Sequence, residues 1–387
     1  MDAFAGFQKE IYMAGLGDVL PELPTDLTRL EAVAETRMSA TSFGYVAGAA
    51  GSESTARANR DAFGRWRLVP RLLRDVSSID TSVTVLGTAM PAPLALAPIG
   101  VLSVVHPDGE SAAARAAAAL GVPMVVSTAA TTTLEHVAEA AGDGSRWYQL
   151  YWPRDRELAV SFLERAAAAG YRALVVTLDT HTMGWRPRDL DAAFLPFLRG
   201  LGNQNFFADP AFQRALGGPV DEESFGPAVL QWASTFGNPM LTWDDLGFLR
   251  EHWRGPIALK GIQHPDDARR AAEAGMDGIV VSNHGGRQVD GAVASLDALP
   301  AVVEAVGDRI EVLFDSGVRT GADVIKALAL GARAVLLGRP FVYGLGLAGE
   351  AGVRHVLRCV LAELELTMAL TGITRVADLG PELLARG

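Results

Sequence analysis

A pattern that recurs four times along the chain constrains its fold more than any other feature. Each time, an alanine-rich stretch with helical periodicity ends in glycine, and a short, wholly apolar segment follows. The pairs are Gly121 before 124–126, Gly170 before 174–176, Gly275 before 279–281 and Gly331 before 335–337. Glycine just past a helix end adopts the left-handed conformation that other residues resist. Apolar strands that alternate with helices predict a parallel sheet covered by helices.

Eight strand candidates can be counted, which favours a closed barrel over an open, doubly wound sheet. They lie near residues 94–97, 124–127, 147–150, 174–177, 257–260, 279–282, 312–315 and 335–337. We therefore expect one domain over residues 1–387, with a (β/α)8 TIM barrel at 81–370. Residues 1–80 are predicted to form a helical N-terminal extension. Residues 83–90 are predicted to form a hairpin that turns at Gly87 and could plug the bottom of the barrel.

A long connection at residues 187–241 separates the fourth and fifth strand candidates. It is rich in phenylalanine, including Phe194, Phe197, Phe206, Phe207 and Phe212. Connections of this length are usually functional or disordered, and the aromatic residues argue against disorder. We expect a lid over the site or a contact between subunits. Membrane docking is less favoured, because acidic and polar residues are interspersed and no basic face accompanies the aromatics.

Composition and charge exclude several classes of partner. Of 387 residues, 49% are hydrophobic and 20% are charged, which is typical of globular proteins. The net charge of -11 argues against binding of nucleic acid. Cys359 is the single cysteine, so no internal disulfide is possible and a cytoplasmic location is expected. No apolar run approaches the roughly 20 residues that span a bilayer, and the N-terminus does not resemble a signal peptide.

Polar residues follow two neighbouring strand candidates at the edge where barrel enzymes build their active sites. Lys260 ends the apolar segment 256–259, and the run Ser282–Gln288 follows the next strand with His284 and Arg287 inside it. A lone histidine there would be interpreted as an ordinary strand-end residue. A cation, an imidazole and a guanidinium together suit a reaction that takes a proton, binds an anion and stabilises developing negative charge. We therefore predict a catalytic role for His284.

Two residues after the fourth strand candidate could complete such a site. Arg186 and Arg287 could hold a carboxylate with bidentate contacts, although Arg186 could instead pair with Asp189 or Asp191 at the surface. Asp179 could orient and stabilise an imidazolium at His284. A structural carboxylate or a helix cap is an equally good interpretation of Asp179.

The loops after the seventh and eighth strands have the composition of a phosphate site. Barrels frequently bind phosphate there. Gly317 and Gly338 allow close approach of the backbone, while Arg319 and Arg339 supply positive charge. No zinc-ligand spacing or Rossmann glycine motif is present. A base, arginines and a phosphate site without a metal indicate a bound cofactor. Flavin mononucleotide (FMN) would suit, with Lys260 stabilising its reduced ring.

On these residues the chain resembles the FMN-dependent 2-hydroxy-acid oxidising enzymes, the family of glycolate oxidase, lactate oxidase and mandelate dehydrogenase. The resemblance runs from residues 43–48 through 338–340, and its most specific segments are 259–265, 282–288 and 315–321. Residues 185–190 and 194–200 resemble the lactate 2-monooxygenase branch in particular.

The resemblance implies a role for each candidate residue. His284 would be the base, Asp179 its partner and Lys260 the cation beside flavin N1 and O2. The substrate carboxylate and hydroxyl would lie against Arg186, Arg287, Tyr45 and Tyr151. The cofactor would contact Pro98, Ile99, Gly100, Ser127, Gln149, Thr177, Lys260, Ser282, Asp315, Gly317, Arg319, Gly338 and Arg339.

The implied reaction is oxidation of an L-2-hydroxy acid with O2 as acceptor. Lactate converted to acetate and CO2 is the leading expectation, and a bulkier acid such as mandelate is the alternative. Gly100 stands where many family oxidases have Ala or Thr, which predicts extra room beside flavin N5. Ala129 stands where plant-type members have Trp, which predicts space for a larger substrate side chain. A homo-oligomer, a tetramer or octamer, is also implied.

Two rival functions are less favoured. A barrel that binds flavin without turnover would have no reason to keep the base, both arginines and the lysine. A flavin-dependent isomerase would bind diphosphate and would not need the pair Arg186 and Arg287.

Overall fold

Eight parallel strands close into a barrel in the computed structural model, which describes residues 4–387. Around the barrel the hydrogen-bonded order is β10-β11-β4-β5-β6-β7-β8-β9. The strands are β4 (Leu94–Leu96), β5 (Met124–Ser127), β6 (Arg146–Leu150), β7 (Leu174–Thr177), β8 (Ile257–Ile262), β9 (Gly278–Val281), β10 (Glu311–Phe314) and β11 (Ala334–Leu337). The predicted (β/α)8 TIM barrel is confirmed, since all eight predicted strands are present.

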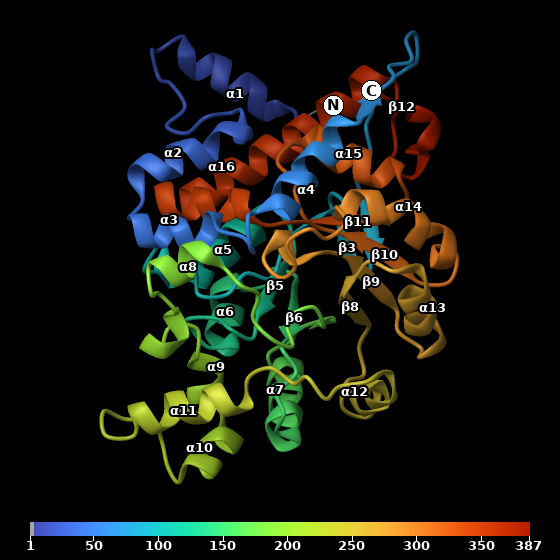
Figure 1. The fold of residues 1–387 in the computed structure, drawn as a ribbon. Helices are drawn as coiled ribbons and strands as arrows, with labels where there is room; N and C mark the ends of the chain where they lie inside the picture. Colours follow the sequence, from blue (N-terminus) through green and yellow to red (C-terminus); the bar gives the residue numbers. More distant parts are fainter. Residues whose placement is uncertain (1–3) are drawn as a thin grey trace.

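Helices surround this barrel (Figure 1). They include α5 (Gly109–Ala118), α6 (Leu134–Ala141), α7 (Arg156–Ala168), α12 (Leu246–His252), α13 (Pro265–Glu273), α14 (Ser295–Val306), α15 (Gly321–Ala329) and α16 (Arg339–Thr371). The four glycines of the repeat have φ between 67° and 103°, so each takes the left-handed conformation that its position predicts. The alanine-rich helices pack closely on the strands, and most of the buried side chains are apolar.

The predicted hairpin lies inside the barrel. Strands β2 (Val83–Val85) and β3 (Thr88–Met90) pair, and their apolar side chains join a cluster that contains at least one residue of every barrel strand. Trp147 Nε1 donates a hydrogen bond to Thr88 Oγ1 at 3.0 Å. The hairpin therefore fills the barrel at the amino-terminal ends of its strands.

The N-terminal extension is mainly helical and reaches the opposite end of the barrel. It contains α1 (Gly6–Gly15), the 3-10 helix Leu27–Arg29, α2 (Leu30–Arg37), α3 (Ala40–Ala47) and α4 (Ser54–Gly64). A short strand, β1 (Trp66–Leu68), pairs antiparallel with β12 (Leu384–Arg386). The sequence does not predict this pair, because three-residue strands far apart in the chain have too weak a pattern.

The segment 187–241 packs against the loop that follows β5. It contains α8 (Pro187–Asp191), the 3-10 helix Pro196–Arg199, α9 (Gln204–Phe207), α10 (Pro210–Leu216) and α11 (Phe225–Thr235). Rings of Phe197, Trp232 and Phe236 stack with centroid distances of 4.8 and 4.9 Å. The fully buried Asn205 donates from Nδ2 to the carbonyl of Thr128 at 3.0 Å. These contacts hold the segment over the carboxyl-end rim.

Within residues 4–387, no helix is both long enough and apolar enough to cross a membrane.

Candidate active site

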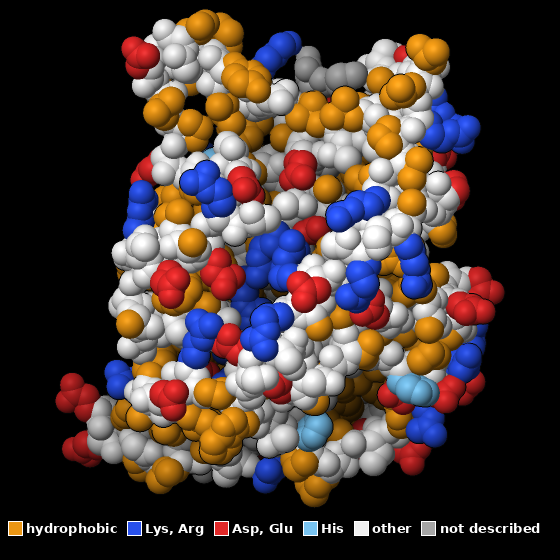
Figure 2. All heavy atoms as spheres, turned by 45° about the horizontal axis from the view of Figure 1, so that its top comes forward, with side chains coloured by type: hydrophobic (Ala, Val, Ile, Leu, Met, Phe, Trp, Pro, Cys, Tyr) orange, Lys and Arg blue, Asp and Glu red, His pale blue; other side chains and the backbone are white. Residues whose placement is uncertain are grey.

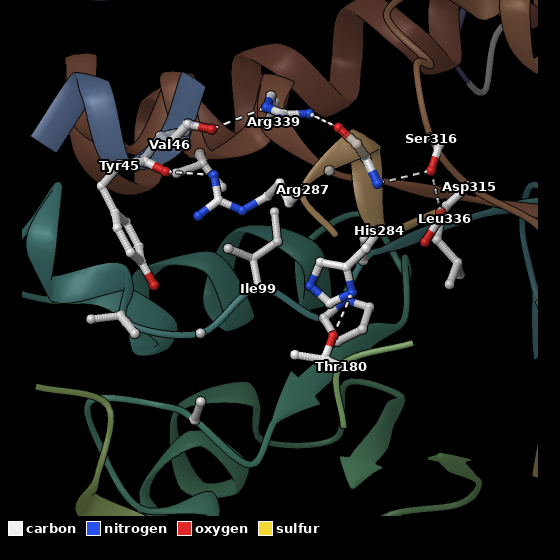
Figure 3. Close-up of a pocket in the computed structure, with 18 of the residues that line it drawn as sticks. Tyr45, Val46, Ile99, Thr180, His284, Arg287, Asp315, Ser316, Leu336 and Arg339 are labelled. Carbon is white, nitrogen blue, oxygen red and sulfur yellow. Dashed lines mark hydrogen bonds between the residues drawn. The ribbon is translucent and has the colours of Figure 1, made fainter. Parts of the chain in front are cut away.

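One cavity at the carboxyl-end rim gathers most of the predicted site residues (Figure 3). Its empty space, including the open mouth, is about 1210 Å³. The predicted residues that line it are Tyr45, Pro98, Ile99, Gly100, Tyr151, Arg186, Lys260, His284, Arg287, Asp315, Gly317, Arg319, Gly338 and Arg339. Figure 2 shows Lys and Arg side chains gathered near the middle of one face of the molecule.

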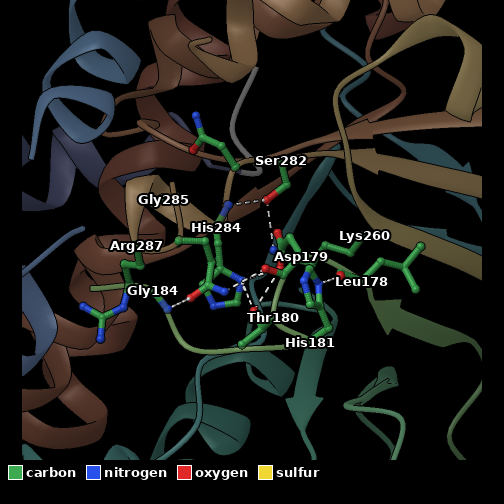
Figure 4. A network of polar contacts seen from close by, with 12 residues as sticks. Leu178, Asp179, Thr180, His181, Gly184, Lys260, Ser282, His284, Gly285 and Arg287 are labelled. Carbon is green, nitrogen blue, oxygen red and sulfur yellow. Dashed lines mark hydrogen bonds and ion pairs between the residues drawn. The ribbon is translucent and has the colours of Figure 1, made fainter. Parts of the chain in front are cut away.

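His284 and Asp179 form a hydrogen-bonded pair across the ends of β9 and β7 (Figure 4). His284 Nδ1 lies 2.8 Å from Asp179 Oδ1 and 3.1 Å from Thr180 Oγ1. Burial lowers the pKa of His284, so the imidazole is neutral at neutral pH. Burial would raise the pKa of Asp179, but the charge of Lys260 and the charge that His284 carries once it is protonated at acid pH lower it to about 2. An ionised carboxylate on Nδ1–H leaves Nε2 free to accept a proton.

The turn that carries His284 has an unusual backbone. His284 has a φ of 59°, and Gly285 and Gly286 follow with φ of 67° and 79°. A Cβ at Gly286 would collide with the backbone of Ala56 in α4, so this glycine allows the turn to approach the helix. The glycines that follow His284 and the contact with α4 therefore help to keep His284 in its left-handed conformation.

A buried amide pair supports this turn from α4. Asn59 and Asn283 exchange two hydrogen bonds of 2.8 Å, and both side chains are buried. Asn283 Oδ1 also accepts from the Gly286 N–H at 3.1 Å. The N-terminal extension thus helps to position His284.

Arg186 and Arg287 both line the cavity, as a carboxylate-binding pair requires. Arg186 donates to the Arg287 carbonyl at 3.0 Å and to Gln288 Oε1 at 2.7 Å. Arg287 Nη1 donates to the carbonyls of Tyr45 and Gly48, at 2.7 and 2.6 Å. Burial and the neighbouring charge of Arg287 lower the pKa of Arg186 to about 10. The two guanidiniums repel each other, so a bound carboxylate would relieve an existing electrostatic strain.

Tyr45 and Tyr151 also line the cavity, and their phenols remain protonated. Burial raises the pKa of Tyr45, and it raises that of Tyr151 to about 12. Each ring packs edge-on against a phenylalanine of the region after β7, Tyr45 against Phe194 and Tyr151 against Phe236. Both hydroxyls are therefore available as hydrogen-bond donors at neutral pH.

Lys260 is a buried cation on β8, at the base of the cavity. Its Nζ lies 3.0 Å from Ser282 Oγ and 3.2 Å from Asp315 Oδ2. Burial would lower the pKa of Lys260, but the charges of Asp315 and Asp179 raise it. The ammonium group is therefore a fixed positive charge that could stabilise negative charge on a bound ring.

The other end of the cavity has the features of a phosphate site. Helix α16 begins at Arg339, with Gly338 before it, and this N-terminus lines the cavity together with residues 315–319 of the loop after β10. Arg319 and Arg339 line this end. Arg339 donates to the carbonyls of Val46, Gly285 and Gly48 at 2.9 to 3.0 Å. Burial lowers the pKa of Arg339 to about 10.

Four predicted cofactor contacts lie outside the cavity lining in this structure. Ser127, Gln149 and Ser282 are buried next to it, while Thr177 lines a second cavity together with Asp179. Gln149 Nε2 is buried without a hydrogen-bond partner. Such an orphaned donor at a strand end is what a heterocyclic carbonyl or ring nitrogen would satisfy. This donor, the buried Lys260 and the start of α16 together fit FMN.

Several residues that line the cavity were not predicted as site residues, and two of them are aromatic. Phe197 and Phe236 come from the region after β7 and cover the site. The richness of this segment in phenylalanine was the available signal, but it could not indicate which rings point inward.

The prediction of extra room at Gly100 is wrong. A Cβ built there would collide with the carbonyl oxygen of Ala129 and would lie 2.9 Å from the Ala129 Cβ. A glycine is needed at this position because the loops after β4 and β5 pass close together. The absence of a side chain therefore leaves no empty space there. Ala129 does line the cavity, as its predicted role in admitting larger substrates requires.

The chain is similar to several known enzymes that act on hydroxy acids. The profile of a family described as FMN-dependent dehydrogenase matches residues 34–386. The chain is 48% identical to FMN-dependent alpha-hydroxy acid dehydrogenase qulF of Penicillium citrinum, covering 99% of this chain and 96% of that protein. It is 46% identical to an L-lactate oxidase of Lysinibacillus sphaericus, covering 92% and 91%. Among solved structures, mandelate oxidase with (S)-4-hydroxymandelic acid has a TM-score of 0.83 and 39% identity, covering 94% and 99%.

Proposed function

Because the chain belongs to the FMN-dependent dehydrogenase family and is an FMN enzyme that oxidises a 2-hydroxy acid, we propose that it oxidises the L-enantiomer with O2 as acceptor. The convergence of His284, Arg186 and Arg287 on one cavity is the observation that most supports oxidation of a 2-hydroxy acid, and the similarity to an L-lactate oxidase supports the enantiomer and the acceptor. A 2-hydroxy acid presents a carboxylate and an ionisable hydroxyl to such a site.

The chain's own residues perform the proton and charge steps. Arg186 and Arg287 bind the substrate carboxylate, and Tyr45 and Tyr151 donate toward its oxygens. His284 Nε2 accepts the proton that leaves the substrate. The Asp179 carboxylate, 2.8 Å from Nδ1, stabilises the imidazolium that results.

Bound FMN supplies the ring that accepts the two electrons. We propose that Lys260 stabilises negative charge there and that Ser127, Gln149, Thr177 and Ser282 contact the ring. The phosphate end would be held by Asp315, Gly317, Arg319, Gly338 and Arg339. The backbone of Pro98, Ile99 and Gly100 would form the wall beside it.

Oxidation of L-lactate to acetate and CO2 is the first candidate for the detailed reaction. It is supported by the segment 187–241, which covers the cavity with packed aromatic side chains and could retain a keto product. A bulkier acid such as mandelate is the second candidate. It is supported by the small Ala129 and by the apolar lining from Phe197, Phe236 and Met183. We also expect a cytoplasmic homo-oligomer, a tetramer or octamer.

Anaerobic addition of L-lactate and, separately, L-mandelate to the purified holoenzyme tests the proposal. Bleaching of the flavin absorbance is expected with at least one of them, and the acid with the larger rate constant identifies the side-chain class. Aerobic product analysis then distinguishes acetate from pyruvate. If no L-2-hydroxy acid bleaches the flavin, the proposed function is wrong.

A further inference from the structure

Two loops together form one wall of the active-site cavity. The first follows β4 and contributes residues 97–102, and the second follows β5 and contributes Ala129. The loops touch directly, since the Val101 N–H donates to the Ala129 carbonyl at 2.9 Å. A Cβ at Gly100 would collide with that same carbonyl. The position of one loop therefore depends on the position of the other.

The first loop is held in a strained conformation. Val101 has a φ of 59° and a ψ of 34°, which is the left-handed region. For a β-branched residue this conformation is a true outlier, and it persists only when the surroundings enforce it. Val101 is also 2% exposed, so its side chain is packed in place. Some contact must hold this residue against its backbone preference.

Glu110 makes contacts that hold both loops. Its Oε1 accepts from the N–H groups of Leu102 at 3.1 Å and Thr131 at 3.0 Å, and its Oε2 accepts from Thr131 Oγ1 at 2.5 Å. Thr131 Oγ1 in turn accepts from the Ser103 N–H at 3.3 Å. One carboxylate thus binds the residue after Val101 and a residue two positions after Ala129.

The burial of this carboxylate sets it apart from a surface helix residue. Glu110 is the second residue of α5 and is 1% exposed. Within residues 4–387, no lysine, arginine or histidine nitrogen is paired with it. Burial raises the pKa of Glu110. A buried carboxyl group without a cation is costly unless hydrogen bonds satisfy it, and here both of its oxygens bind the cavity wall.

We propose that Glu110 is a positioning residue for the reaction: it clamps the loops after β4 and β5 together, keeps Val101 in its left-handed conformation, and so fixes the wall against which the flavin and the substrate lie. The kinetic consequence rests on the proposed function. The clamp itself is a property of the chain's own residues. Misplacement of a reacting group by about 1 Å can reduce a rate by about 100-fold, so a loosened wall is expected to slow catalysis.

Glu110→Ala is the first test, because it leaves the N–H groups of Leu102 and Thr131 without an acceptor. We expect the rate constant of anaerobic flavin reduction to fall about 10- to 100-fold. The KM for substrate and the FMN dissociation constant are expected to change less than about threefold, since no group that binds either is removed. Glu110→Gln keeps the acceptor for both N–H groups and is expected to recover most of the rate.

Hydrogen exchange provides a readout that does not depend on activity. In Glu110→Ala the amides of Leu102 and Thr131 are expected to exchange faster, while amides of the strands on the far side of the barrel do not change. The matched control is Glu350→Ala, which removes the acceptor of a 2.7 Å hydrogen bond from Arg115 of the same helix but touches neither loop. It should leave the rate and both amides unaltered.

Several results would overturn the proposal. One is a reduction rate in Glu110→Ala within about twofold of that of the unmodified enzyme, with FMN bound. Another is unchanged exchange at Leu102 and Thr131. If Glu110→Ala does not fold, Thr131→Val decides, because it removes the hydroxyl that donates to Glu110 Oε2 and accepts from the Ser103 N–H. This variant should slow reduction about 3- to 10-fold. If none of the 2-hydroxy acids reduces the flavin of the unmodified enzyme, the proposed function is wrong. Hydrogen exchange at Leu102 and Thr131 then tests the clamp by itself.

Discussion

Replacing Asp179 with asparagine is a direct test of the paired base. The substitution keeps an oxygen that can accept from His284 Nδ1–H and removes only the charge. Two unit charges 2.8 Å apart at an effective dielectric of about 20 interact by about 6 kcal/mol, which sets an upper bound. The difference between a charge-assisted and a neutral hydrogen bond, about 1 kcal/mol, sets the lower bound. At about 1.4 kcal/mol per factor of ten, flavin reduction should slow between about 5- and 10⁴-fold.

The pH profile of the variant gives a second, independent signature. The charge of Asp179 raises the pKa of His284, so its loss should lower that pKa further. The acid limb of kcat/KM should therefore move to lower pH, while the plateau falls. Rapid-mixing measurements of flavin absorbance over a pH series would record both quantities.

The matched control is Thr180→Val, which removes neutral contacts to the same ring nitrogen at 3.1 Å and to Asp179 Oδ1 at 3.0 Å but keeps the charge of Asp179. It should slow reduction less than about fivefold and leave the acid limb in place. The interpretation of Asp179 and His284 as a catalytic pair is refuted if Asp179→Asn retains the plateau rate, or if its acid limb moves to higher pH.

Four further predictions follow from the same geometry. Arg186→Lys should raise the KM for the 2-hydroxy acid about 10- to 100-fold with a smaller effect on kcat, measured by steady-state kinetics. Lys260→Met leaves the Asp315 carboxylate buried and unpaired, so urea unfolding should show a loss of about 3 to 5 kcal/mol that Asp315→Leu partly restores. Phe206→Ala, at a fully buried position of the aromatic cluster, should lower stability by about 3 to 5 kcal/mol in thermal unfolding. The pKa of Asp179 falls from 3.8 to about 2 on folding, so its ionisation contributes about 2 kcal/mol to stability above pH 4, and this contribution is lost as the pH falls to 2. The free energy of unfolding of Asp179→Asn, measured by urea unfolding, should therefore decrease less between pH 4 and pH 2.

The fold could be predicted almost completely from local patterns. Apolar strands, alanine-rich helices and the glycines between them repeat often enough to give the number, order and direction of the barrel strands. The hairpin at 83–90 was also predictable, because an alternation of apolar and polar residues and a central glycine are local signals in the sequence. The pair of β1 and β12 was not, since neither strand has a pattern of its own and each exists only because the other lies beside it.

The site was predictable to the extent that residue type and strand position decide chemistry. Parallel strands end on one rim, so polar residues at strand ends 179, 260 and 284 had to lie near one another. The role of Gly100 was predicted wrongly, because a sequence shows a missing side chain but not the neighbour that approaches it. Phe236 and Glu110 were missed for the same reason: the sequence does not show which ring faces the cavity or which N–H groups a buried carboxylate binds.

By itself, the sequence determined the barrel, the chemical groups at its rim and the family resemblance, because periodicity and residue type are local properties. Only the tertiary structure decided which side chains line the cavity, where two loops come too close for a Cβ, and which buried carboxylate holds them together. These depend on distances between residues that the chain brings together only when the barrel closes.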